Sequence, residues 1–315
     1  MIDISFTAVV ALAFIGDIVF GDPPNRLHPV AWMGNAISWV RRSVPSYAES
    51  MCFFWGVALV CIGVLIVGFI GWFIQQICLL CPVYVNVLVQ ALVLKCTFTI
   101  SSLAKAAQSV CTAIRKADIL SARQQVAYHL VSRDVSNLNA SKLAAATVES
   151  VAENTSDSVI APLFFFAFAG LPGALVYRFV NTCDAMLGYH TPELEWFGKA
   201  AARTDDLLNL LPSRVTAILM LAVGAIRTGR FRSSVRIWLR DHRLTASPNA
   251  GHPMSAAAGV LGVVLEKEGY YILGADQSSP NAKSIEQSIR MLWDTSVVGI
   301  FLLVVAVQCW EWVRG

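Results

Sequence analysis

Three carboxylates recur at intervals of four residues in the segment Glu149-Ser-Val-Ala-Glu153-Asn154-Thr-Ser-Asp157. Positions four apart share one face of a helix, so the spacing predicts a single acidic column. Like charges at that spacing weaken a helix unless a divalent cation, a basic substrate group or basic side chains compensate them. Mg²⁺ takes carboxylate oxygens and often bridges to phosphate. Glu149, Glu153 and Asp157 are therefore candidate catalytic residues and metal ligands, and Asn154 is a candidate substrate contact. A solvated acidic helix face is the structural alternative.

A second polar group follows an apolar stretch. Asn181 and Asp184 lie three residues apart and therefore share a helical face, and Tyr189 comes shortly after them. We take Asp184 as a candidate catalytic residue and Asn181 and Tyr189 as candidate substrate contacts.

A third polar group borders the next apolar stretch and consists of Arg203, Asp205, Asp206, Asn209 and Arg214. Adjacent carboxylates in such a place are costly unless paired, and ionisable groups at membrane depth are functional candidates by default. Asp205 and Asp206 are therefore candidate catalytic residues, and Arg203, Asn209 and Arg214 are candidate substrate contacts. A plain ion pair between Asp205 and Arg203 or Lys199 would also explain the pattern.

Two loops complete the set of candidates. The segment 21–29 contains Asp22 and His28 among prolines that end an apolar run, and both are candidate substrate contacts. The segment 247–253 has turn chemistry and leads into a small-residue helix expected over 255–265. Ser247, the Asn249 amide and the free N–H groups of that helix, expected to begin after Pro253, could hold an anion. The chain has no phosphate-binding P-loop, dinucleotide fingerprint or serine nucleophile elbow.

The elements that position these residues belong to a membrane protein. The chain of 315 residues is 56% hydrophobic and 14% charged, whereas a soluble domain carries about 25% charged residues. Residues 51–94 contain no Asp, Glu, Lys or Arg, and about 20 apolar residues cross a bilayer as a helix. The net charge of +3 gives no indication of a nucleic-acid partner.

The apolar runs predict membrane spans at 4–20, 52–74, 83–103 and 295–310. Two further segments are apolar but interrupted. The segment 158–177 contains Pro and Gly residues, and the segment 207–226 contains Pro212 and Arg214. We expect an all-α, polytopic integral membrane protein with about 4–6 membrane-embedded helices, polar helical segments on the cytoplasmic side and a single domain over 1–315.

Charge placement limits the topology. The basic residues in 21–50, in 104–157 and after 226 all indicate cytoplasmic loops. The segments 158–177 and 207–226 must therefore both cross or both stay at the inner face. Their Pro and Gly breaks favour the second arrangement, which places the polar stretch around His190 on the cytoplasmic side.

Five motifs together resemble the adenosylcobinamide-phosphate synthase family of cobalamin biosynthesis (CobD/CbiB). They are Gly-Asp-Pro…His-Pro-Val at 21–30, Glu-Ser-Val-Ala-Glu-Asn-Thr-x-Asp…Ala-Pro-Leu at 149–163, Asn-Thr-x-Asp-x-Met-x-Gly-Tyr at 181–189, Ala-Arg-x-Asp-Asp…Asn…Pro-x-Arg at 202–214 and Ser-Pro-Asn-Ala-Gly…Ala-Gly-Val-Leu-Gly at 247–262. The chain departs from the family at Arg178 and His190, where we expect Lys, and at His252, where many members have Trp.

The resemblance implies a ligase that joins the amine of (R)-1-aminopropan-2-ol phosphate, or of aminopropanol itself, to adenosylcobyric acid, with ATP and Mg²⁺ as implied cofactors. The resemblance makes the acidic residues candidates for binding the metal ion or the amine. It makes Arg203 and Arg214 candidates for binding phosphate. It also implies a multi-pass protein of the cell inner membrane with a cytoplasmic active site, whose partners include the lipid bilayer and other late cobalamin-assembly enzymes.

Two other functions remain open from the residues alone. A metal-dependent membrane phosphotransferase would use the same carboxylates but would transfer a phosphate-linked group to a lipid. A transporter would show inverted halves with paired broken segments, and the sequence shows no such halves.

Overall fold

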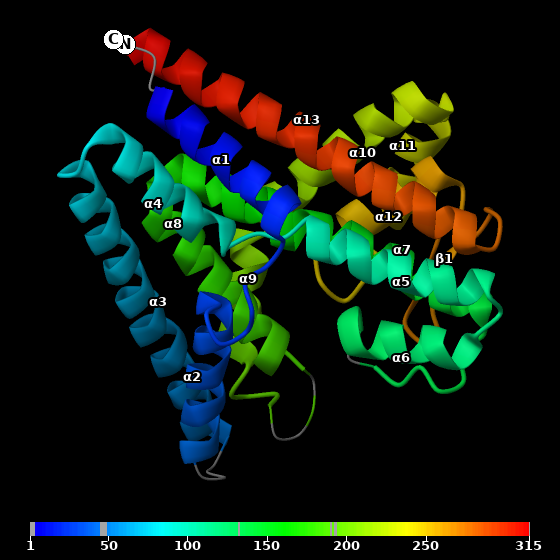
Figure 1. Ribbon diagram of the computed structural model, residues 1–315. Coiled ribbons are helices and arrows are strands. Elements are labelled where there is room, and N and C mark those ends of the chain that lie inside the picture. The colour runs from blue at the N-terminus through cyan, green and yellow to red at the C-terminus, as the bar shows by residue number, and fades with distance from the viewer. Residues whose placement is uncertain (1–3, 45–48, 132, 190, 192–193, 315) are drawn as a thin grey trace. The chain divides into compact units, whose positions relative to one another are not determined.

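The computed structural model describes residues 4–44, 49–131, 133–189, 191 and 194–314, and these are almost entirely helical (Figure 1). The helices are α1 (Ile4–Phe20), α2 (Pro29–Ser43), α3 (Glu49–Leu79), α4 (Val83–Lys95), α5 (Ser101–Arg115), α6 (Ile119–His129), α7 (Ala140–Thr155), the π-helix η1 (Ser156–Ile160), α8 (Ala161–Leu187), α9 (Lys199–Leu208), α10 (Leu210–Thr228), α11 (Phe231–Asp241), α12 (Gly251–Leu261) and α13 (Ala282–Arg314). Strands β1 (Leu265–Lys267) and β2 (Tyr271–Leu273) form one antiparallel hairpin.

Four helical segments are long and apolar enough to cross a membrane: Glu49–Leu79, Ala140–Leu187, Leu210–Thr228 and Ala282–Arg314. Large apolar side chains on α3, such as Leu65, Ile66 and Phe69, are exposed on the surface of the protein. A bilayer solvates such a surface, whereas water would not. The prediction of an all-α, polytopic membrane protein is confirmed.

The expected span over 83–103 is wrong. Helix α4 has 13 residues and is therefore roughly 20 Å long, which is short of the roughly 30 Å of a bilayer core. It ends at Lys95, and α5 begins at Ser101 after a turn. The Lys95 ammonium is buried between the carboxylates of Asp17 (3.1 Å) and Asp22 (2.6 Å), so the end of α4 is held against the end of α1.

The expected interruption within 158–177 is confirmed. Helix α8 is kinked at Ala169 and Gly170. Gly170 has a φ of 63°, a conformation that glycine adopts at a lower cost than any other residue. The Gln75 side chain of α3 accepts a hydrogen bond from the Leu171 backbone N–H (2.9 Å), which the kink has left without a helical partner.

In 207–226 the chain breaks at Asn209 between α9 and α10, and Pro212 lies in the first turn of α10, where proline is tolerated. Both interrupted segments belong to helices that could cross a membrane by length and composition. That both segments stay at the inner face of the membrane without crossing it remains a prediction. His190 lies outside the described residues.

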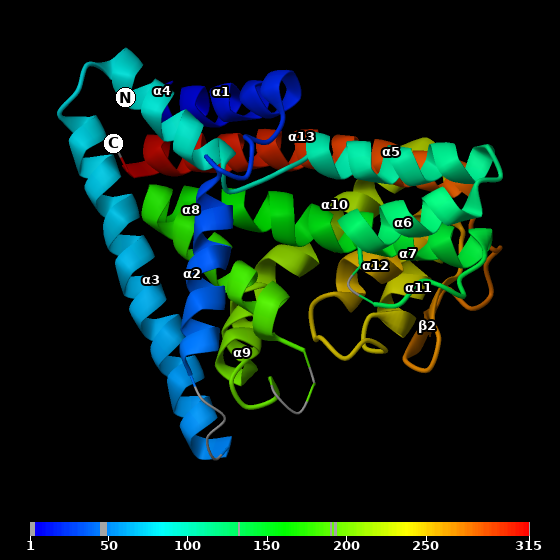
Figure 2. The ribbon, with the colours of Figure 1, turned by 60° about the horizontal axis from the view of Figure 1, so that its bottom comes forward.

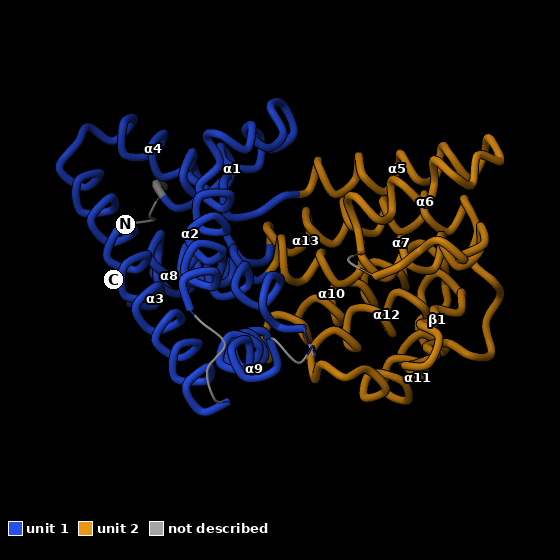
Figure 3. The backbone as a smooth tube through the Cα atoms, turned by 90° about the horizontal axis from the view of Figure 1, so that it is seen from below, with its two compact units in different colours: residues 1–99, 161–209, 302–315 blue, residues 100–160, 210–301 orange. Residues whose placement is uncertain are grey.

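The chain forms two compact units, each assembled from segments far apart in the sequence (Figure 3). Unit 1 comprises residues 1–99, 161–209 and 302–315, and unit 2 comprises 100–160 and 210–301. In unit 1, α1 lies beside α4 (Figure 2), and α3 packs closely on α8. A Cβ at Gly71 of α3 would lie 2.8 Å from the Pro172 backbone, so this approach requires glycine. The prediction of one domain over 1–315 stays a prediction.

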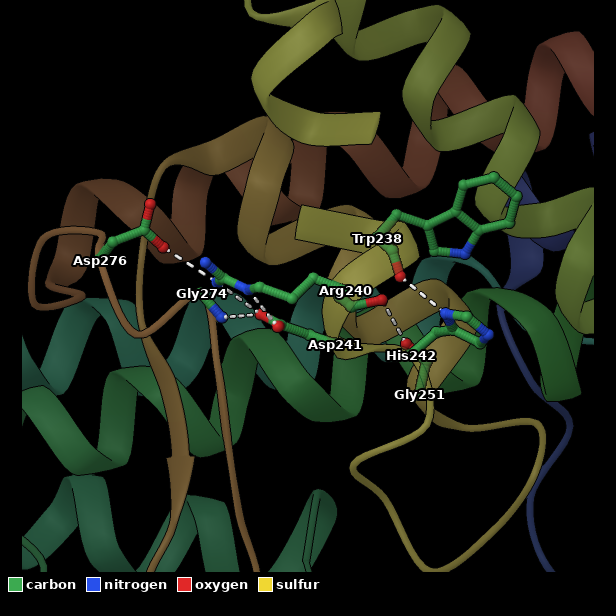
Figure 4. Close-up of polar contacts among 8 residues, drawn as sticks. Trp238, Arg240, Asp241, His242, Gly251, Gly274 and Asp276 are labelled. Carbon is green, nitrogen blue, oxygen red and sulfur yellow. Dashed lines mark hydrogen bonds and ion pairs between the residues drawn. The ribbon is translucent and has the colours of Figure 1, made fainter. Parts of the chain in front are cut away.

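Unit 2 is built around α7, whose residues from Leu143 to Ala152 are all buried. Helix α12 is also buried along nearly its whole length, and α10 and α11 pack on it. The buried carboxylate of Asp241, at the end of α11, accepts hydrogen bonds from the Gly274 backbone N–H (2.7 Å) and from Arg240, which also pairs with Asp276 (Figure 4). These contacts hold the end of the β-hairpin against α11.

We predict that Lys95→Met destabilises the protein by about 3–5 kcal/mol, because it leaves two carboxylates without their shared buried cation. The melting temperature of the detergent-purified protein measures this effect. Lys116→Met, which removes an exposed lysine, should change the melting temperature little. Adding Asp17→Asn to Lys95→Met should restore part of the loss, and equal melting temperatures for wild type and Lys95→Met would contradict the prediction.

Candidate active site

A small cavity in unit 2 collects charged side chains from three segments. It measures about 190 Å³ and is lined by Leu130, Val131, Arg133, Ala146, Glu149, Ser150, Glu153, Lys267 and Tyr271. Helix α7 contributes the two carboxylates, the loop after α6 contributes Arg133, and the β-hairpin contributes Lys267 and Tyr271. We call it the α7 cavity.

Glu149 is the central acidic group of the α7 cavity. Its side chain is 7% exposed, and its Oε2 pairs with the Arg133 guanidinium at 3.2 Å. Its Oε1 is buried and accepts no hydrogen bond from the described protein atoms. The Ser150 hydroxyl, which donates to the Leu130 carbonyl (3.0 Å), ties α7 to the loop that carries Arg133. A buried carboxylate oxygen with no donor is costly, and the Tyr271 phenol lies near enough to Glu149 for the carboxylate to raise its pKa.

A π-helix interrupts the predicted acidic column before Asp157. The π-helix begins at Ser156, between Glu153 and Asp157, and its wider turn changes the face on which later residues lie. Glu149 and Glu153 line the α7 cavity and Asp157 does not. Asn154 is held within the helix, since its amide donates to the Ser150 carbonyl (2.9 Å) and accepts from the Ser158 hydroxyl (3.0 Å).

The predicted metal site is not assembled in the part of the chain that the structure describes. There, no group of three or more His, Cys, Asp or Glu side chains is placed to hold a metal ion. Glu149 already pairs with Arg133. The geometry therefore does not fit a resident metal held by protein ligands alone.

Sequence reasoning missed Arg133, Lys267 and Tyr271 as members of this site. The hairpin had a usable signal, because Gly269 follows Glu268 between two short runs rich in β-forming residues, and its φ is 76°. Burial and then the negative charges of Glu149 and Glu153 raise the pKa of the Tyr271 phenol. Tyr271 therefore stays protonated beside the carboxylates.

In unit 1, three of the predicted residues meet. Asp205 accepts hydrogen bonds from the side-chain amides of Asn181 (3.3 Å) and Asn209 (2.9 Å), and the buried Tyr177 hydroxyl donates to Asn209 (2.9 Å). Burial raises the pKa of Asp205 to about 6, against the lowering effect of the two amides. Among the described residues Asp205 is therefore hydrogen-bonded to two amides, and not ion-paired with Arg203 or Lys199 as the sequence also allowed.

The neighbouring candidates are more open to solvent. Asp184 and Asp206 are half-buried, Arg203 is exposed, and Tyr189 is 42% exposed. Arg178, which the sequence analysis named only as a departure from the family, donates to the Asn181 side-chain oxygen at 3.4 Å and so extends the amide network.

Asp22 and His28 have clear structural contacts. Asp22 accepts from Lys95 (2.6 Å) and from the Thr99 hydroxyl (2.8 Å), two residues that the sequence analysis missed. The Nδ1 atom of His28 accepts from the Val30 N–H and caps α2. Burial lowers the pKa of His28, although the nearby Asp22 acts in the opposite direction.

The 247–253 loop and α10 form a second polar site in unit 2. The Asn249 side-chain oxygen accepts from Arg214 (2.9 Å) and Ser213 (3.4 Å), and the Ser247 hydroxyl accepts from the Asn249 N–H (3.2 Å). The Asn249 side-chain oxygen therefore holds Arg214, and a contact between the Asn249 amide and an anion stays a prediction. Helix α12 begins at Gly251, not after Pro253, and it ends at Leu261, so the expected helix over 255–265 was placed too late.

Beside this loop lies a pocket of about 510 Å³, which we call the basic pocket. It is lined by Arg214, His242, Arg243, Thr245, Ala246, Pro248 and His252. The Trp238 indole donates to the Nδ1 atom of His252 at 3.1 Å. Burial, followed by the charges of Arg214, His242 and Arg243, lowers the pKa of His252 from 6.5 to about 4.

Comparison with known proteins identifies the family. The family model described as "CobD/Cbib protein" matches residues 10–292. The chain belongs to the CobD/CbiB family. A cobalamin biosynthesis protein CobD from Dehalococcoides mccartyi is 39% identical over 296 residues, which cover 94% of this chain and 96% of that protein.

Another CobD/CbiB relative, from Methanothermobacter thermautotrophicus, is named "Probable cobalamin biosynthesis protein CobD". It is 36% identical over 308 residues, covering 95% of this chain and 99% of its own length. No solved structure matches the chain. The region shared with the CobD/CbiB family contains the α7 cavity, the Asp205 network and the basic pocket, and it stops before the last part of α13.

We predict that His252 makes stability fall at acid pH. Its depressed pKa means that the folded state keeps the imidazole neutral, while the unfolded chain binds a proton below about 6.5. The melting temperature should therefore fall as the pH drops from 6.5 toward 4. His252→Gln can still accept the Trp238 hydrogen bond but cannot titrate, so its melting temperature should fall less. The exposed His129 provides the matched control, His129→Gln; identical pH profiles for His252→Gln and wild type would refute this role.

Proposed function

We propose that this protein catalyses a late step of cobalamin biosynthesis, the ATP-dependent amide ligation of (R)-1-aminopropan-2-ol phosphate, or of aminopropanol, to adenosylcobyric acid. Membership of the CobD/CbiB family and the names of its relatives support the pathway. The observation that carries the reaction type is the α7 cavity, where two carboxylates and two cations line one small space.

The chemistry needs activation of both partners. A carboxylate and an ammonium group are each in the wrong state for amide formation at neutral pH. Transfer of the γ-phosphoryl group of ATP to the substrate carboxylate gives an acyl phosphate and ADP. The amine then loses a proton to a base and attacks the carbonyl carbon, and inorganic phosphate leaves. Positioning and charge stabilisation are the main contributions that a protein makes to such transfers.

Carboxylates of this chain can handle the amine. Glu149 and Glu153 can bind the ammonium in the α7 cavity. Glu149 is also a candidate for the base that takes the proton of the amine, and Asp205, whose pKa is about 6, is a separate acid–base candidate within unit 1.

Arg214 and Arg243 of the basic pocket can bind the nucleotide phosphates. Mg²⁺ accompanies ATP in such reactions and is commonly held by one or two carboxylates plus phosphate oxygens. We assign it no protein site, because the described residues do not assemble one.

The location of the reaction follows from its substrates. ATP and the corrinoid are met in the cytoplasm, so we propose a multi-pass protein of the inner membrane with its active site on the cytoplasmic face. Other late cobalamin-assembly enzymes are proposed partners there, and the bilayer surrounds the apolar helices.

A direct assay tests the function. Membranes that contain the protein are incubated with adenosylcobyric acid, aminopropanol phosphate and Mg-ATP, and the corrinoids are analysed by mass spectrometry. The expected product carries the amine as an amide, and isotope label in the amine must be retained. Transfer of a phosphate-linked group to lipid, without an amide product, would instead support a phosphotransferase.

We predict that Glu149→Gln lowers the turnover number about 100-fold or more, the range found when a positioned acid–base group is lost. Asp157→Asn should cost less than about 10-fold, because Asp157 lies beyond the π-helix start and does not line the cavity. Both variants should still be found in the membrane fraction. Equal losses for the two variants would mean that the column acts as a unit, against the assignment made from the cavity.

A further inference from the structure

Two histidine rings lie side by side in the wall of the basic pocket. His242 follows α11 and His252 lies in the first turn of α12, and their ring centres are 4.5 Å apart. Trp238 of α11 contacts both of them. Its indole N–H donates to the Nδ1 atom of His252 (3.1 Å). Its backbone carbonyl lies 2.9 Å from the Nδ1 atom of His242, as Figure 4 shows. One residue therefore engages the same nitrogen atom of both rings.

These two contacts require different forms of the two rings. An indole N–H can only donate, so the Nδ1 atom of His252 keeps its lone pair and the proton of that ring is on Nε2. A backbone carbonyl can only accept, so the Nδ1 atom of His242 carries a proton. The Nε2 atom of His242 is then the nitrogen that can accept a hydrogen bond. The wall of the pocket thus combines a donor on His252 with an acceptor on His242.

The other charged side chains of the pocket are cationic. They are Arg214 and Arg243, and no carboxylate is among the described residues that line the space. Arg214 donates to neutral oxygens, those of the Asn249 side chain (2.9 Å) and of the Leu210 carbonyl (2.7 Å). Two guanidinium groups without a carboxylate in the same wall favour an anionic ligand.

The acidic residue beside His242 in the chain does not change this balance. Asp241 is buried, and its carboxylate accepts hydrogen bonds from Arg240 and from the Gly274 backbone N–H. The charges of Arg214, His242 and Arg243 all disfavour a proton on His252. The His252 ring therefore stays a neutral donor while the arginines supply the charge.

We propose that the basic pocket binds inorganic phosphate as the dianion that carries one proton, and that Trp238 positions the two rings for it. Arg214 and Arg243 pair with the negative oxygens. The Nε2–H group of His252 donates to one of them, and the Nε2 atom of His242 accepts from the P–OH group. Sulfate has the same charge and shape but no proton to donate, so the pocket should discriminate against it.

This inference deepens the proposed function and rests on it for the source of the phosphate. Attack of the neutral amine on the acyl phosphate gives the amide and HPO₄²⁻, and the proton that the amine loses is the one that the phosphate gains. The phosphorus atom is the one that ATP delivered as its γ-phosphoryl group. One pocket can therefore hold this group in the nucleotide and again after its release.

Isothermal titration calorimetry on the purified full-length protein, in slightly alkaline buffer of constant ionic strength, tests the inference. The probes are inorganic phosphate and sulfate, each added alone. Phosphate should bind at least about tenfold more tightly than sulfate, as expected for one additional hydrogen bond to a charged group. Equal affinities for the two anions, or no binding of phosphate, would overturn the inference.

Matched variants separate the acceptor from the cations. His242→Phe keeps a ring in place but removes the acceptor, so phosphate should bind at least about tenfold more weakly and sulfate as before. Arg243→Met should weaken the binding of both anions. His129→Phe and Arg236→Met change exposed residues of unit 2 that do not line the pocket, and both affinities should stay unchanged. An equal loss for both anions in His242→Phe would count against the acceptor role.

Nitrogen NMR of protein labelled in its histidine rings tests the role of Trp238. His252 should carry its proton on Nε2 and His242 on Nδ1. Phosphate, but not sulfate, should shift the Nε2 signal of His242. Trp238→Phe keeps an aromatic ring but removes the indole donor, so His252 should become a mixture of tautomers and phosphate should bind more weakly. An unchanged His252 tautomer in this variant would refute the positioning role.

The outcomes for the pocket and for the proposed reaction can be told apart. A protein that binds phosphate with the expected selectivity but forms no amide leaves phosphate binding intact and removes its proposed source. A protein that forms the amide but binds phosphate and sulfate alike keeps the proposed reaction and overturns the inference. ATP is the last probe, and it should displace the bound phosphate. Simultaneous binding of ATP and phosphate would contradict the use of one pocket for both.

Discussion

The burial of the Glu149 carboxylate is the constraint on which the site in unit 2 depends. An ionised carboxylate taken out of water costs several kcal/mol unless cations and hydrogen-bond donors replace the solvent. Helix α7 can carry it inward because the surrounding residues are mostly small, and the loop after α6 then has to bring Arg133 to one of its oxygens. The same carboxylate lines the α7 cavity, so the group that constrains stability is also one that we propose to bind substrate.

Unit 1 handles its buried charges in two other ways. Lys95 lies between Asp17 and Asp22, so opposite charges offset each other and fix the ends of two helices. Asp205 is surrounded by the amides of Asn181 and Asn209, which donate hydrogen bonds but bring no charge. The first arrangement stabilises structure, whereas in the second burial raises the pKa of the carboxyl group to about 6.

Irregular helix geometry places these groups. A π-helix begins at Ser156, between Glu153, which lines the cavity, and Asp157, which does not. The kink at Gly170 bends α8, and the Gln75 side chain accepts the hydrogen bond of the Leu171 N–H group there. π-Helical turns interrupt the regular hydrogen bonding of an α-helix and are frequent at functional sites. The clamp of Asp241 on Gly274 similarly fixes the hairpin that supplies Lys267 and Tyr271, so a strand pair of three residues each can serve as a wall of the cavity.

The sequence alone determined the helical membrane class, the family and most of the polar residues, because apolar runs and motif spacing are local properties. It also predicted the acidic pair Glu149 and Glu153 and the break before Leu171. Only the tertiary structure decided that Asp157 leaves the column, that α4 stops at Lys95, and that Asn249 holds Arg214. Arg133 and Lys267 could not be assigned from sequence because the cavity that they line is built from segments distant along the chain. Lys95 could not be assigned because its carboxylate partners lie on a distant segment. The local pattern records which charges exist, and the folded chain decides which of them are left for a substrate.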